Sequence, residues 1–101
     1  MQEVEMKEKE EVYEVLLSGD IDSGKSQEFF NLVTAPFERE PKDVIFRCEN
    51  LNFIDSTTLG TFVKILKRVR SAGKNMKLTG LQAKIKKLFT ICSLDTIMEM
   101  E

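Results

Sequence analysis

The sequence of 101 residues contains no histidine, only two cysteines and no long apolar run. Histidine is the commonest general base in enzymes and the commonest zinc ligand, so its absence excludes a Ser-His triad and argues against hydrolytic or metal-dependent catalysis. Cys48 and Cys92 are too few for a disulfide framework and match no metal-binding spacing. Because both lie in apolar patterns, we expect both to be buried. We therefore expect a protein that is not an enzyme and holds no metal or cofactor.

Segments for export or membrane insertion are also missing. No apolar stretch approaches the ~20 residues that a membrane helix needs. Residues 1–11, MQEVEMKEKEE, are acidic and lack the apolar centre of a signal peptide. With 42% hydrophobic and 32% charged residues, the chain fits one globular domain spanning residues 1–101. We expect this domain to be cytoplasmic.

Charge is unevenly distributed along the chain. Residues 1–55 carry 6 basic and 14 acidic residues, a net charge of −8, whereas residues 56–101 carry 9 basic and 3 acidic residues, a net charge of +6. A basic half can bind a polyanion. It lacks an aromatic platform on which bases would stack, so we expect a solvated surface and no nucleic-acid partner.

The apolar periodicity predicts the element order β-β-α-β-α-β-α-(β). Apolar and charged residues alternate at 4–6 and 13–17, which predicts two strands paired as a hairpin. Helical spacing predicts helices that begin at 26, run from about 56 to 72, and lie around 85–92. Further predictions are strands at 44–48 and 76–80, a turn at 19–24, a loop at 49–55, and a short strand or tail at 94–100.

This alternation of strands and helices indicates the α/β class, with a mixed β-sheet of four to five strands and about three helices packed on it. Pro36 should end the first helix nearby, because the residue before proline avoids the α region. Gly73 is the expected end of the second helix. The exposed side of that helix carries Lys64, Lys67, Arg68 and Ser71, which form either a partner-docking stripe or a solvated face.

Residues 19–26, GDIDSGKS, match the phosphate-binding pattern G-x-x-x-x-G-K-[ST]. Such a loop works by presenting positive potential to the phosphates, and here Asp20 and Asp22 would repel them. The apolar strand at 44–48 is followed by Glu-Asn instead of the aspartate that would help to hold magnesium. We expect a strand-to-helix turn with a capping side chain, and a nucleotide-binding protein using Gly19–Ser26 is the less favoured alternative.

Residues 51–60, LNFIDSTTLG, lead into the second predicted helix. Asp55 and Ser56 are both good N-caps, and Thr57 and Thr58 lie in the first turn. A cluster of hydroxyl groups at a helix start is, by itself, usually only a cap.

This segment resembles the STAS domain family, and most closely its stand-alone bacterial anti-sigma factor antagonists. The family pattern is apolar-x-Phe-apolar-Asp-Ser, followed by two small residues and Leu-Gly. Three further segments resemble the family in the same order along the chain: GDID at 19–22, Ala-Gly-Lys at 72–74, and IKKLF with Ser-Leu at 85–94. Thr58 departs from the pattern, because the family usually has Gly or Ala there.

The resemblance implies a phosphoswitch. In such antagonists the serine after the aspartate, here Ser56, is phosphorylated by a partner anti-sigma factor that is itself a serine kinase. The unphosphorylated form binds that partner and frees the sigma factor. The predicted partner-binding residues are Asp22, Asp55, Ser56, Thr57, Thr58, Gly60 and Lys64, of which Lys64 belongs to the basic face of the second helix.

The resemblance also implies a phosphoserine phosphatase as a second partner, and we expect a monomer. The alternative within the same family is a STAS subunit of a scaffold or transport complex that is not phosphorylated.

Overall fold

The computed structural model describes residues 1–101, and its elements follow the predicted order. The strands are β1 (Val4–Glu8), β2 (Val12–Ile21), β3 (Asp43–Ile54), β4 (Met76–Thr79) and β5 (Glu99–Met100). The helices are α1 (Ser23–Arg39), α2 (Ser56–Ser71) and α3 (Ala83–Ile91), with a 3-10 turn at Leu94–Thr96. None of the helices combines the length and apolar character required to cross a bilayer.

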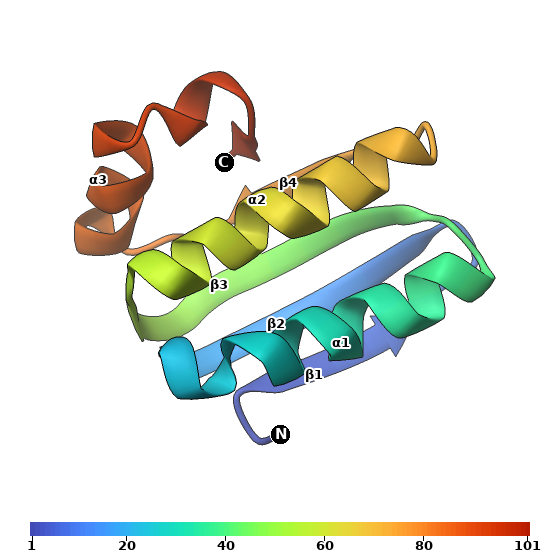
Figure 1. Ribbon diagram of the computed structural model, residues 1–101, viewed down its shortest axis with the longest axis horizontal. Coiled ribbons are helices and arrows are strands. Elements are labelled where there is room, and N and C mark those ends of the chain that lie inside the picture. Colours follow the sequence, from blue (N-terminus) through green and yellow to red (C-terminus); the bar gives the residue numbers. More distant parts are fainter.

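The sheet has the order β1-β2-β3-β4-β5 (Figure 1). β1 pairs antiparallel with β2, and the pairs β2–β3, β3–β4 and β4–β5 are parallel. The predicted mixed sheet with an N-terminal hairpin is therefore confirmed. Because β2 and β3 are parallel neighbours, their C-terminal ends meet at one edge of the sheet, and α1 and α2 both begin there.

α1 and α2 lie side by side on one face of the sheet, and α3 lies near the end of the sheet where α2 begins (Figure 1). The core between these layers contains four phenylalanines in edge-to-face contact, with ring centroids 5.3–6.0 Å apart. All four side chains are fully buried, and they are Phe29 of α1, Phe46 of β3, Phe62 of α2 and Phe89 of α3. The aromatic cluster therefore joins three helices to the central strand.

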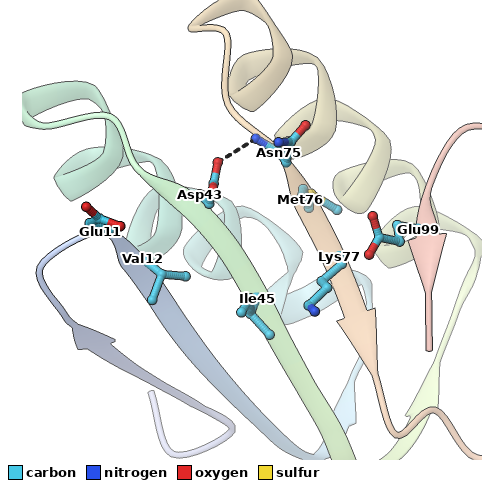
Figure 2. Close-up of a pocket in the computed structure, with 8 residues that line it drawn as sticks. All are labelled: Glu11, Val12, Asp43, Ile45, Asn75, Met76, Lys77 and Glu99. Atoms are coloured by element: carbon cyan, nitrogen blue, oxygen red, sulfur yellow. Dashed lines mark hydrogen bonds between the residues drawn. The ribbon is translucent and has the colours of Figure 1, made fainter.

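The other face of the sheet carries no helix. A shallow hollow of about 410 Å³ lies on it. Figure 2 shows Val12, Ile45 and Lys77 projecting into this hollow from neighbouring strands. Val12 is the first residue of β2, and the hollow also includes Asp43, the first residue of β3. The hollow thus lies at the opposite end of these strands from the helix starts.

α1 ends at Arg39, near Pro36 as predicted, but the residue before the proline stays helical, contrary to the expectation. Pro36 lacks an N–H group and so cannot make one helical hydrogen bond, but only one turn remains after it. The buried Tyr13 hydroxyl stabilises that turn by donating to the carbonyl oxygens of Glu40 (2.8 Å) and Pro36 (3.0 Å).

β2 and β3 are longer than predicted, because residues 19–21 and 49–54 belong to strands instead of a turn and a loop. The two strands pair along this extra length, from Ser18 with Asn50 to Ile21 with Ile54. Two register shifts interrupt the pairing, between Leu16 and Ser18 and between Gly19 and Asp20. Such irregularities break the alternation of apolar and polar residues by which a strand is predicted.

The two cysteines differ from each other. Cys48 is buried in β3 as expected, and burial raises the pKa of its thiol to about 12. Cys92 is exposed, so its predicted burial is wrong. α3 ends at Ile91, one residue before Cys92. The helical spacing that buries Ile85 and Phe89 therefore does not extend to Cys92.

Candidate functional site

One carboxylate holds the starts of both helices. Asp55 is the N-cap of α2, and its Oδ1 accepts a hydrogen bond of 2.9 Å from Thr58 N and lies 3.0 Å from Thr58 Oγ1. Its Oδ2 accepts a hydrogen bond of 2.7 Å from Ser23 N, the first residue of α1. Asp55 therefore caps its own helix and ties it to the neighbouring one.

The hydrogen bonds to Asp55 also favour its ionised form. The Thr58 N–H holds the pKa of the Asp55 carboxyl below its usual value, and the Ser23 N–H and Thr58 hydroxyl act in the same direction against desolvation. The carboxylate is therefore charged at neutral pH and satisfied by groups of its own chain. Asp22 makes a simpler cap, because one carboxylate oxygen accepts from Gly24 N at 3.0 Å and the side chain is otherwise exposed.

Thr58 lies inside the protein, with 0% of its surface exposed. Its Oγ1 is 2.6 Å from Ile21 O and 2.7 Å from Ser26 Oγ. Ile21 O can only accept, so this shortest contact takes the Thr58 hydrogen. Ser26 Oγ, which also lies 3.0 Å from Asp22 O, completes the contact between the two hydroxyl groups. This position differs from the expectation that Thr58 meets a partner directly. Its hydroxyl instead joins the end of β2 to the starts of α1 and α2.

Ser56, Thr57, Gly60 and Lys64 lie on the outer side of α2. Ser56 is the first residue of the helix and is exposed, and its hydroxyl makes no hydrogen bond within the chain. Thr57 and Lys64 line a groove of about 210 Å³ between α1 and α2. A Cβ atom added at Gly60 would meet nothing within 4 Å. The helix surface beyond Ser56 is therefore open to close approach.

Of the basic residues predicted on the exposed side of α2, only some lack an ion pair within the chain. Arg68 forms an ion pair with Glu38 and lies over the Phe30 ring, with its guanidinium carbon 5.4 Å from the ring centroid. Lys64 and Lys67 are exposed and form no ion pair. The end of the stripe nearest Ser56 thus remains available.

Residues 19–26 do not form a phosphate-binding loop. Residues 19–21 continue β2, Asp22 caps α1, and the glycine, lysine and serine that complete the pattern lie in the first turn of the helix. Lys25 Nζ lies 3.1 Å from a Glu3 carboxylate oxygen and donates to Asp20 O at 3.2 Å. The expected helix entry with a capping aspartate is confirmed.

Two residues of this site, Ser23 and Ser26, were not among the predicted ones. Ser26 precedes Phe29 by three positions and Val33 by seven, a spacing that places it on the buried side of α1. That spacing predicts burial of Ser26, whereas the phosphate-binding pattern would require its hydroxyl to be accessible. No sequence pattern indicates that the Ser23 N–H binds a carboxylate 32 residues away.

A model of the STAS domain family matches residues 3–101. The chain belongs to the STAS domain family. This STAS domain is 29% identical over 97 residues to the anti-sigma-B factor antagonist of Staphylococcus aureus, covering 96% of this chain and 90% of the relative.

Two solved structures share the fold of this STAS domain. The anti-sigma factor antagonist SpoIIAA in its unphosphorylated form has a TM-score of 0.86 at 16% identity, covering 97% of this chain and 87% of that one. The Bacillus cell fate determinant SpoIIAA in the phosphorylated form has a TM-score of 0.78 at 16% identity, covering 97% and 90%. The predicted fold and family are therefore confirmed.

Substitution Asp55→Asn should destabilise the STAS domain at neutral pH. An amide has one accepting oxygen, so its NH2 group would face either Thr58 N–H or Ser23 N–H, and one helix would lose its cap. The lowered pKa means that the stabilisation is present above the unfolded-state value, about 3.9, and is lost as pH falls through the folded value. The difference between wild type and variant should therefore shrink below about pH 4 in denaturant titrations.

The matched control is Asp22→Asn, which retains the single accepting oxygen that Gly24 N requires. We expect it to destabilise the domain much less. Equal losses for the two variants, or a difference for Asp55→Asn that does not decrease in acid, would contradict the role assigned to the Asp55 carboxylate.

Proposed function

We propose that this STAS domain is an anti-sigma factor antagonist that is switched by phosphorylation of Ser56. In its unphosphorylated form it binds an anti-sigma factor that is also a serine kinase, and so releases the sigma factor. The single observation that carries this proposal is the free, exposed Ser56 hydroxyl beside a carboxylate that holds both helix starts. The names of the relatives support the same class of function.

The division of roles between neighbouring residues suits a switch. Asp55 and Thr58 make the hydrogen bonds that order the start of α2, whereas the Ser56 side chain makes none. A kinase can therefore bind and phosphorylate the Ser56 hydroxyl without breaking a contact of the fold. Phosphorylation in this proposal leaves the fold intact and changes only the surface.

The surface change is mainly one of charge. A phosphoserine adds about −1.5 to −2 charges near pH 7. At Ser56 it joins Asp55 and Asp22, which are already acidic and lie at the same edge of the sheet. A partner surface that fits the unphosphorylated form would then have to bury or oppose the added charge, which weakens binding. A phosphoserine phosphatase would restore the binding form. The domain itself acts as a monomeric binding module in this scheme and catalyses no reaction.

The experiment that tests the switch uses the purified domain, the anti-sigma factor kinase of the same organism, and ATP. We expect phosphate to map to Ser56 by mass spectrometry. Ser56→Ala should bind the kinase constitutively, and Ser56→Asp should bind it at least about tenfold more weakly, because a surface that fits the neutral serine would have to bury or oppose the added charge.

The matched control is Ser71→Asp, which adds the same charge at an exposed serine on the last residue of α2. It should bind like the wild type. Phosphate on another residue, or no phosphate with an active kinase, would reject the switch. Equal binding by Ser56→Asp and wild type would favour a STAS subunit that is not phosphorylated.

Gly60→Ala should separate stability from binding. Glycine within a helix costs roughly 0.5–1 kcal/mol relative to alanine, and the added methyl group would meet nothing in this chain, so the variant should be more stable in denaturant titrations. A partner packed on α2 beside Ser56 would collide with that methyl group. Because over-packing a contact costs about 1–3 kcal/mol, binding to the kinase should weaken by about fivefold or more. Unchanged binding would show that the partner does not approach Gly60 closely.

A further inference from the structure

An apolar patch lies beyond the residues assigned to the switch. Phe53 is 49% exposed, Leu88 is 39% exposed and Ile91 is 68% exposed. Phe53 and Leu88 line a groove of about 140 Å³ between the end of β3 and α3. Ile91 follows Leu88 by three positions on α3 and so continues the same helix face. We call Phe53, Leu88 and Ile91 the α3 patch.

The fold does not require the α3 patch to be apolar. α3 packs on the core through Ile85 and Phe89, which are 2% and 0% exposed, and β3 packs through its neighbouring apolar residues Leu51 and Ile54. A phenylalanine at the end of a strand with half of its surface in water stabilises little. Large exposed apolar side chains gathered around a groove are typical of surfaces that bind another molecule.

The α3 side of the α3 patch is positively charged, whereas Asp20, which pairs with Phe53, adds an acidic side chain on the β2 side. α3 carries three lysines and no acidic residue, and Lys84 lines the groove itself. All three lysines are exposed and none forms an ion pair within the chain. The complementary ligand is therefore a protein segment with an apolar side chain for the groove and acidic side chains that face the lysines of α3.

The α3 patch is continuous with the surface around Ser56. Phe53 precedes Ser56 by three residues in one segment, so their Cα atoms are at most about 11 Å apart. A stable interface covers about 800 Å² and 20–30 residues on each partner. An interface centred on Ser56 is thus wide enough to include Phe53 and the groove.

We propose that the α3 patch is a second docking surface for the same anti-sigma factor kinase, filled by an acidic segment with an apolar anchor. This inference rests on the proposed function. It separates two tasks on one partner: α2 presents the serine that is modified, and the α3 patch supplies binding that phosphorylation does not touch.

Two variants test this docking surface, with a control for each. Leu88→Gln removes the apolar anchor site and should weaken binding of the unphosphorylated domain to the purified kinase by about fivefold or more, as for a contact at the centre of an interface. Its control is Leu32→Gln, on α1, where leucine is 38% exposed and lies outside the groove. This control should bind like the wild type.

Lys84→Glu reverses the charge of the groove rim at an exposed position, so it tests the surface even if Leu88→Gln disturbs folding. It should reduce the association rate, and the reduction should decrease as salt is raised. Its control is Lys74→Glu, beyond the far end of α2, which should associate at the wild-type rate. Both test variants should still be phosphorylated on Ser56 at saturating domain concentration, with a raised KM and an unchanged kcat.

The outcomes separate this inference from the proposed function. If Ser56→Asp loses binding while Leu88→Gln and Lys84→Glu bind like the wild type, the switch stands and the second docking surface is rejected. If the wild-type domain binds no anti-sigma factor kinase, both are rejected. If Leu88→Gln instead converts a dimer to a monomer in sedimentation at unchanged kinase affinity, the patch binds a second copy of the chain and the inference is overturned.

Discussion

The hydrogen bonds of the Asp55 carboxylate are the interaction on which the functional end of this STAS domain depends. Two oxygens of one side chain accept from Thr58 in α2 and from the first backbone N–H of α1. Parallel pairing of β2 and β3 brings the two helix starts together, but pairing alone would leave their free N–H groups to water. Asp55 satisfies groups from both helices, and the buried Thr58 and Ser26 hydroxyls close the space beneath it.

In the proposed switch, this arrangement lets a phosphate be added next to a structural centre without damaging it. Ser56 directly follows Asp55 and begins the first turn of α2, yet its side chain makes no hydrogen bond within the chain. The neighbours that hold the start of the helix, Asp55 and Thr58, already make their hydrogen bonds within the chain. A phosphate on Ser56 would not compete with these contacts. Its charge would lie on the outer surface of α2, near Gly60 and Lys64, where the proposed partner binds.

The sequence was sufficient to predict the architecture, because the helices and the hairpin have strong apolar periodicity. It was insufficient where a tertiary contact overrides a local preference. The residue before Pro36 was expected to leave the helical region, but α1 continues to Arg39, and the distant Tyr13 hydroxyl supports the final turn. Residues 19–21 and 49–54 lack a clear alternation, and they form strands because each segment supplies the other's pairing partner.

The candidate site shows the same limits. The motif was enough to predict Asp55 and Ser56 as neighbours at a helix start, but it did not reveal that the aspartate also binds α1. Thr58 was included among the partner-binding residues because of the resemblance, and helix geometry turns its side chain inward. Contacts between residues about 32 positions apart, such as that of Ser26 with Thr58, become visible only in three dimensions.

The central claim is that phosphorylation changes the surface and not the fold. It is tested most directly by comparing amide NMR spectra of the domain with and without phosphoserine at position 56. The account predicts shift changes confined to residues near the two helix starts, about 19–26 and 53–60, with signal dispersion retained throughout the sheet. Changes spread over β1 and β4, or a general loss of dispersion, would contradict it.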